Sequence, residues 1–176
     1  MSIIAAVLVF LFTSTDDADA LRRTAPNDLT TEAAMEHLTS ARMAAVLYGI
    51  DADMLLSTAY YESRYTSGVI GPVVSGKTAC GVLQPTMETK CTGQTVFEDY
   101  LDGAKHLKDW YQACRGNDRC ALLGYGGGYA LIKSCAEGPV MRERGGHDVD
   151  LCTAIPDTRQ FRARWIKKER TKHVIS

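Results

Sequence analysis

The chain contains six cysteines, and their pairing constrains the fold more than any other feature (Cys80, Cys91, Cys114, Cys120, Cys135 and Cys152). None forms a Cys-x-x-Cys pair or lies at a zinc-finger spacing from a histidine, so we expect no metal site. An even number of cysteines without a metal-binding pattern is typical of a disulfide-bonded protein from an oxidising compartment. We expect sequence neighbours to pair, namely Cys80 with Cys91, Cys114 with Cys120 and Cys135 with Cys152. Six buried free thiols in a reducing cytosol are the alternative.

The N-terminal segment points to the same compartment. Residues 3–12 form an unbroken apolar run, and Ala18-Asp19-Ala20 has the small-x-small pattern after which signal peptidases cleave. We therefore expect residues 1–20 to be a cleaved signal peptide and the mature protein to be secreted or periplasmic, without a stable membrane span. Because Met1-Ser2 carries no basic residue, an uncleaved N-terminal helix, buried or membrane-associated, is the alternative.

The composition excludes two classes of protein. The 176 residues are 45% hydrophobic and 23% charged, with a formal net charge of -1. A disordered chain needs fewer apolar residues and a larger net charge, and a globally basic nucleic-acid binder needs an excess of Lys and Arg. The chain is therefore expected to form one globular domain with its own core and no specific nucleic-acid partner.

Helical periodicity predicts a mainly α fold. Residues 21–30 look like a polar tether, and residues 65–94 and 134–154 have no sustained period and are predicted to be loops. The first two helices are expected from after Thr30 to Tyr48, with a Gly49 cap, and from Asp51 to about Arg64. A third is expected from the Thr95–Glu98 capping box to about Cys114. The last two are expected to begin near Asn117, with an interruption at residues 126–128, and at Pro156, running through Ile166.

One carboxyl group lies on a helix face that is otherwise apolar. Leu55, Ala59 and Glu62 are spaced so that all three fall on the core-facing stripe of the second predicted helix. A carboxyl withdrawn from water stays protonated to higher pH, which is what a general acid needs near neutrality. The alternative is that Glu62, at a helix end, reaches solvent or pairs with Arg64.

Five segments occur in a fixed order along the chain. They are Glu62-Ser63 at the end of an amphipathic helix, Gly81-Val82-Leu83-Gln84, Gly103-Ala104 within a helix, residues 121–128 around Tyr125, and Pro156-Asp157-Thr158-Arg159-Gln160-Phe161. In this order and spacing, over about residues 45–168, the chain resembles the catalytic domain of soluble lytic transglycosylases, which belongs to the lysozyme-like superfamily. The resemblance implies a lysozyme-like fold for residues 45–176 with a loop-rich, disulfide-stapled middle, preceded by a tether and first helix over residues 21–44.

The resemblance also implies roles for individual residues. Glu62 matches the single catalytic acid and Ser63 the hydroxyl that accompanies it. Gly81 and Gln84 match the segment that lines the substrate cleft, and Tyr125 matches the aromatic hydroxyl that faces the acid.

Val82-Leu83 replaces the family's Leu-Met, an apolar exchange that should be tolerated, and two polar positions also depart from the pattern, with Gly126 where asparagine is usual and Phe161 where tyrosine is usual. Both replacements remove a polar group that could position a sugar. The departures put fine substrate positioning in doubt but leave the acid in place.

The implied activity is cleavage of the β-1,4 bond between N-acetylmuramic acid and N-acetylglucosamine, with a 1,6-anhydro-muramic product and no cofactor. A hydrolytic muramidase that uses a second carboxylate, with Asp99, Asp102 or Glu88 as candidates, is one alternative. A degenerate module that binds glycan without cutting it is another. The implied partner is the glycan strand of peptidoglycan. The protein would act on it in secretion, conjugation, wall remodelling or phage entry, and for phage entry the protein would be a component of the virion.

Overall fold

The computed structural model describes residues 13–25, 29–74, 76–87 and 94–172. This part of the chain is mainly helical, as predicted. The helices are α2 (Thr15–Thr24), α3 (Thr31–Tyr48), α4 (Ala52–Ser63), α5 (Val96–Ala113), α6 (Asp118–Glu137) and α7 (Leu151–Thr171). The strands are β1 (Ile70–Val74), β2 (Lys77–Cys80), β3 (Thr86–Met87), β4 (Met141–Arg144) and β5 (His147–Asp150).

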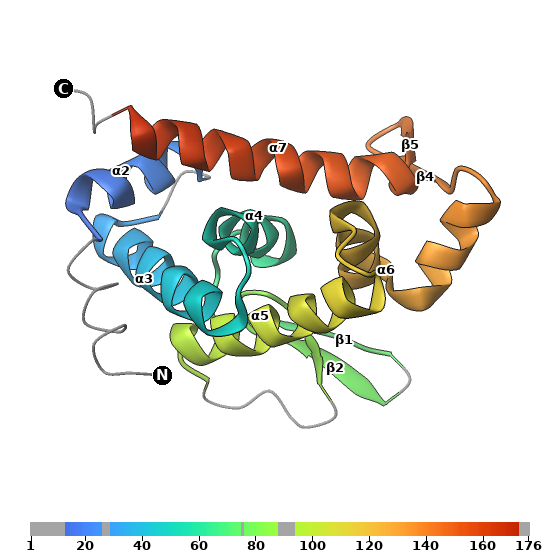
Figure 1. The fold of residues 1–176 in the computed structure, drawn as a ribbon, viewed down its shortest axis with the longest axis horizontal. Coiled ribbons are helices and arrows are strands. Elements are labelled where there is room, and N and C mark those ends of the chain that lie inside the picture. Colours follow the sequence, from blue (N-terminus) through green and yellow to red (C-terminus); the bar gives the residue numbers. More distant parts are fainter. Residues whose placement is uncertain (1–12, 26–28, 75, 88–93, 173–176) are drawn as a thin grey trace.

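Helix α4 lies in the middle of the molecule, with α7 along one side and α3 and α5 along the other (Figure 1). Its residues Leu55, Leu56 and Ala59 are fully buried. They belong to one apolar cluster that also contains Leu107 of α5 and Ile166 of α7. Packing on several sides therefore fixes the position of α4, and its last turn directly follows this buried stretch.

Local hydrogen bonds explain where the predicted helices begin and end. The side chain of Thr30 accepts a hydrogen bond from the amide of Ala33, and Asp51 accepts from the amides of Asp53 and Met54. Thr95 and Glu98 form the predicted capping box at the start of α5. Gly49 ends α3 with a φ of 64°, a conformation that favours glycine.

The predicted tether over residues 21–30 is wrong for its first part. Residues up to Thr24 belong to α2, which packs against α3 and α7 and buries Ala18 and Leu21 completely. The helix has aspartates in its first turn and arginines in its last turn, an arrangement that the helix dipole favours. Because α2 continues through Ala20, the predicted cleavage site lies inside a folded helix; cleavage itself stays a prediction, and residues 1–12 lie outside the described residues.

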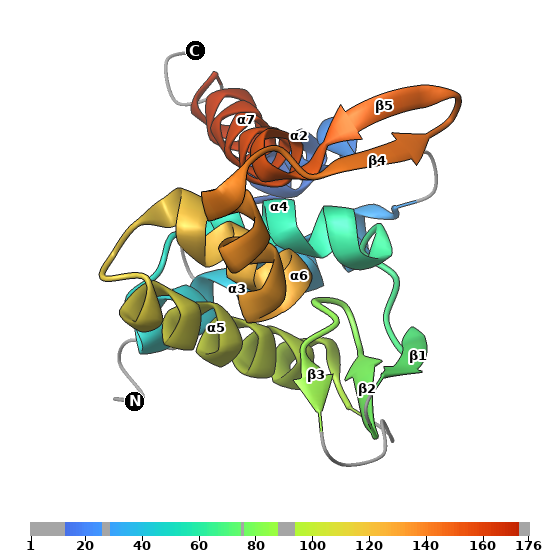
Figure 2. The same cartoon turned by 90° about the vertical axis from the view of Figure 1, so that its right-hand side faces the viewer.

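The two segments predicted to be loops contain small antiparallel sheets. Strands β1, β2 and β3 form a sheet beside the end of α4, with Thr78 opposite Met87 and Ala79 opposite Thr86 (Figure 2). Strands β4 and β5 form an exposed hairpin that projects past α7. Its turn is Gly145-Gly146, both with positive φ, which is the two-residue turn that matches strand twist.

The last two helices also differ from their predicted bounds. Helix α6 extends to Glu137 and has a kink at Gly128, where φ is 67° and ψ is -170°. Helix α7 begins at Leu151, so Pro156 lies inside the helix instead of opening it. Asp150 caps α7 by accepting a hydrogen bond from the amide of Cys152.

Two of the predicted disulfides are confirmed, namely Cys114–Cys120 and Cys135–Cys152. Cys80 is also disulfide-bonded, and Cys91, its predicted partner, lies outside the described residues. The Cys135–Cys152 bond joins the end of α6 to the start of α7 and closes the segment that carries the β4–β5 hairpin. Within the described ranges, no helix is both long and apolar enough to cross a membrane.

Candidate active site

Glu62 lies in the last turn of α4 and forms an ion pair with a residue of α7. Its Oε1 accepts a hydrogen bond from Nη2 of Arg159 at 2.5 Å. The Glu62 side chain is 22% exposed and that of Arg159 is 7% exposed, so the pair is largely shielded from water. Arg64 is not the partner, because its guanidinium lies over the Tyr60 ring, 4.1 Å from the ring centroid.

Burial raises the pKa of Glu62 above its ordinary value. The charge of Arg159 and its hydrogen bond lower the pKa, but the loss of hydration is the larger effect. The Glu62 carboxyl therefore holds its proton to higher pH than an exposed glutamate does, and it has a cation beside it once the proton has left. Both properties suit a group that donates a proton and later takes one back.

Arg159 is a site residue that sequence reasoning missed. Its backbone carbonyl accepts a buried hydrogen bond from Ser57 Oγ at 2.7 Å, which ties α7 to α4. A Cβ at Gly126 would lie 3.2 Å from Ile155 Cγ2, a tight contact, and 3.5 Å from Arg159 Nη2, an ordinary van der Waals distance. The glycine at position 126 thus allows α6 to approach Ile155 of α7 closely, next to Arg159.

Tyr125 lies close enough to Glu62 for the two groups to interact electrostatically. Burial, and then the negative charge of Glu62, raise the pKa of Tyr125 well above its ordinary value. The hydroxyl donates a hydrogen bond to the Leu83 carbonyl at 2.7 Å, and the ring meets His106 edge-on at 5.1 Å between centroids. Tyr125 thereby joins α6 to the turn between β2 and β3.

Gly81 and Gln84 shape that turn. Gly81 has a φ of 71°, and a Cβ there would collide with the carboxylate of Asp99. The Gln84 side chain donates hydrogen bonds from Nε2 to the carbonyls of Val69, at 2.8 Å, and Gly81, at 2.7 Å. The amide donors of Gln84 therefore hold the turn together.

Ser63 is bonded within its own helix, because its Oγ donates to the Ala59 carbonyl at 3.2 Å. Among the predicted residues, Tyr125 is near enough to Glu62 to feel its charge and is bonded to Leu83, which lies in the turn that Gly81 and Gln84 shape, whereas the Ser63 hydroxyl is turned to its own backbone.

The other candidate carboxylates have structural partners. Asp99 is almost fully buried and accepts a hydrogen bond from the Val82 amide at 3.0 Å, and burial raises its pKa. Asp102 accepts a hydrogen bond from the Gln94 side chain at 2.7 Å. Glu88 lies outside the described residues.

Helix α7 also carries arginine and aromatic side chains beyond Arg159. The Arg162 guanidinium lies 3.1 Å from the centroid of the Tyr60 ring and 5.4 Å from that of Trp165. Phe161 is 64% exposed, and Trp165 is 36% exposed one turn further along α7. Phe161 is two residues from the buried Arg159, so it lies on the opposite, solvent-facing side of α7 from Glu62.

Comparisons with known proteins gave no match to a protein-family model, to a curated protein or to a solved structure. A function for this chain must therefore be inferred from the geometry of the described residues. Among those residues, no three histidine, cysteine, aspartate or glutamate side chains gather closely enough to hold a metal ion.

Proposed function

We propose that the chain is a peptidoglycan lytic transglycosylase with a lysozyme-like fold and that Glu62 is its catalytic acid and base. The observation that carries the proposal is the half-buried Glu62 carboxyl at the end of the central helix, with a raised pKa and Arg159 beside it. The ordered segments that resemble the family add to it, because they supply Tyr125, which feels the charge of Glu62, and the Gly81–Gln84 turn, to which the Tyr125 hydroxyl is bonded.

In the proposed reaction the protonated form of Glu62, which the raised pKa makes accessible, donates its proton to the glycosidic oxygen as the bond to C1 of the muramic residue breaks. The Glu62 carboxylate then removes the proton from the C6 hydroxyl of that residue, and the C6 oxygen bonds to C1. The products are a free hydroxyl on one sugar and a 1,6-anhydro ring on the other. Glu62 regains its proton, and no water is consumed.

Arg159 acts as a positioning residue in this scheme. Its guanidinium holds the Glu62 carboxyl by a hydrogen bond and favours the carboxylate form between the two proton transfers. Tyr125, whose hydroxyl is bonded to the Leu83 carbonyl, fixes the wall beside the acid.

A hydrolytic muramidase would need a second carboxylate free to activate water or to act as nucleophile. Asp99 does not suit that role, since its side chain is buried and accepts a hydrogen bond from the backbone. Asp102 is engaged by Gln94. These contacts favour the single-carboxylate mechanism.

The proposed location is outside the cytoplasm, with the protein either secreted, periplasmic or part of a virion. Two disulfides among the described residues are compatible with an oxidising compartment. The proposed partner is the glycan strand of peptidoglycan, which lies outside the cytoplasm.

The test is digestion of purified peptidoglycan by the full chain and by two variants. Glu62→Gln removes the ionisable group and keeps the side-chain shape, and Glu143→Gln, on the exposed β4 strand, is the matched control. We expect the wild type and Glu143→Gln to release soluble fragments at equal rates, and Glu62→Gln to lose at least about a hundredfold in rate. Equal activity of all three proteins would rule out Glu62 as the acid, and binding to the wall without release would indicate the glycan-binding module.

A further inference from the structure

The outer side of α7 carries exposed aromatic and basic residues in one stripe. Phe161, Arg164, Trp165 and Lys168 lie at positions i, i+3, i+4 and i+7, which places them on one face of the helix. Phe161 is 64% exposed and Trp165 is 36% exposed, and both basic residues are exposed. Helix α7 runs along one edge of the molecule (Figure 1). We call these four residues the α7 outer face.

The other side of α7 is occupied by the fold. Arg159, Arg162, Ala163 and Ile166 are buried there, and Arg159 forms the ion pair with Glu62. The α7 outer face therefore points away from α4 and from the candidate active site. A partner that covers the outer face leaves the Glu62–Arg159 pair on the far side of the helix.

The α7 outer face has positive charge that no acidic side chain balances. Neither Arg164 nor Lys168 takes part in a salt bridge within the described residues. Asp157 and Glu169 are the acidic residues of α7, and each is paired with another cation. The face can therefore accept an anionic partner without first breaking an ion pair.

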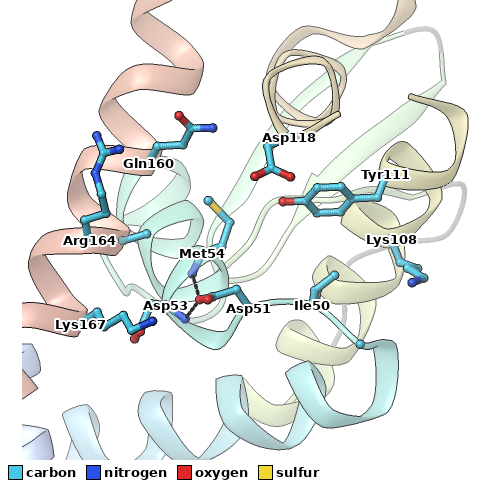
Figure 3. A pocket seen from close by; sticks show the side chains of 12 residues that line it. Ile50, Asp51, Asp53, Met54, Lys108, Tyr111, Asp118, Gln160, Arg164 and Lys167 are labelled. Atoms are coloured by element: carbon cyan, nitrogen blue, oxygen red, sulfur yellow. Dashed lines mark hydrogen bonds between the residues drawn. The ribbon is translucent and has the colours of Figure 1, made fainter. Parts of the chain in front are cut away.

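Lys167 does not belong to this face. It extends from α7 toward Asp53 at the cavity beside the start of α4 (Figure 3). Burial raises the pKa of Asp53, and the charges of Arg170 and Lys167 oppose that rise. Arg164 also borders the cavity, but its guanidinium is turned away from Asp53 (Figure 3). The charge of Arg164 is therefore available to a partner outside the molecule.

We propose that the α7 outer face binds the surface of an anionic lipid membrane. Basic side chains attract anionic headgroups, and aromatic rings on the same helix face enter the boundary between headgroups and acyl chains. An anionic polymer without apolar groups would leave Phe161 in water, and a neutral glycan would offer no charge to Arg164 and Lys168. Single-stranded nucleic acids are held in basic grooves, whereas this face is the convex outside of a helix. The proposal does not depend on the activity proposed for Glu62.

The test measures contact between Trp165 and lipid in the full chain. The vesicles contain three parts phosphatidylcholine to one part phosphatidylglycerol, with brominated acyl chains that quench a tryptophan inserted among them. The other tryptophan is Trp110 on α5, so Trp165→Phe reports the quenching of Trp110 alone. We expect quenching in the wild type, its loss in Trp165→Phe, and none with vesicles of phosphatidylcholine alone. Equal quenching of the two proteins, or none in either, would overturn the proposal.

The readout at Trp165 separates this face from other routes to a vesicle. The apolar run of residues 3–12 could itself hold the chain on lipid, but that contact would quench the wild type and Trp165→Phe alike if α7 stayed in water. Binding of the full chain to polyphosphate without quenching of Trp165 by vesicles would also overturn the proposal, in favour of a polyanion as partner.

Charge-removing variants test the basic part of the face. Arg164→Gln together with Lys168→Gln should raise the lipid concentration for half-maximal quenching of Trp165 about thirtyfold. The matched control, Lys105→Gln together with Arg115→Gln, removes two exposed charges on the α5 side of the molecule and should change that concentration by less than about twofold. Equal changes in the two double variants, or no change in the first, would contradict the proposal.

Discussion

Replacing Arg159 by methionine should destabilise the protein in a way that depends on Glu62. The atoms of the pair are 2.5 Å apart, and the side chains are 7% and 22% exposed. Opposite charges about 4 Å apart attract by about 4 kcal/mol at an effective dielectric constant of about 20. Water that reaches the partly exposed glutamate reduces this value, so we expect Arg159→Met to cost about 2 to 3 kcal/mol at pH 7.5.

A double-mutant cycle measured by urea unfolding isolates the ion pair from the packing of the arginine stem. In the Glu62→Gln background no carboxylate is left unpaired, so Arg159→Met should cost at most about 1 kcal/mol, the value of a neutral hydrogen bond. The coupling energy is then about 2 kcal/mol. It should also shrink as the pH falls through the pKa of Glu62, because a protonated carboxyl carries no charge for Arg159 to balance. A coupling energy below about 0.5 kcal/mol at pH 7.5 would refute this reasoning.

Three further predictions concern stability, each measured by urea or thermal unfolding. Gly81→Ala should lower the free energy of unfolding by about 2 to 4 kcal/mol, because the alanine Cβ would collide with the buried carboxylate of Asp99. Gly68→Ala, at a similar φ but with open space around it, should lower the free energy of unfolding by about 1 to 2 kcal/mol. Equal losses in the two variants would contradict the predicted collision with Asp99. Burial lowers the pKa of His37 to about 4 from an ordinary 6.5, so the folded state favours the neutral ring. About 3 kcal/mol of stability should therefore be present above pH 6.5 and be lost as the pH falls toward 4, and His37→Gln should remove this loss. Replacing Cys135 and Cys152 together by serine should cost about 3 kcal/mol, since the bond closes a separation of 17 residues; no change in stability would show that the bond does not constrain the unfolded chain.

The helices were predictable because their signals are local. Thr30, Asp51 and the Thr95–Glu98 box cap helices through hydrogen bonds to amides only two or three residues away. The Cys114–Cys120 and Cys135–Cys152 disulfides were also predictable, because each joins cysteines that are neighbours in the sequence. Features that depend on neighbours in the chain are those that a periodic pattern or a cap can reveal.

The parts that the sequence did not predict depend on distant contacts. The β1–β3 sheet has short strands, and the adjoining turn is held by the side chain of Gln84 and by the buried carboxylate of Asp99. Arg159, the partner of Glu62, is 97 residues away along the chain. Nothing in the sequence around an arginine on a helix indicates which carboxylate it will contact. The glycine at position 126 gave a signal of a different contact, because a Cβ there would lie only 3.2 Å from Cγ2 of Ile155 on α7.

The role of Glu62 as sole acid and base is tested most directly by the mass of the fragments released from purified peptidoglycan. The account predicts muropeptides that end in 1,6-anhydro-muramic acid, each one water lighter than its hydrolytic counterpart, and none from the Glu62→Gln variant. Fragments with ordinary reducing ends, at the mass of the hydrolytic product, would contradict the account, because they require an activated water and a second carboxylate.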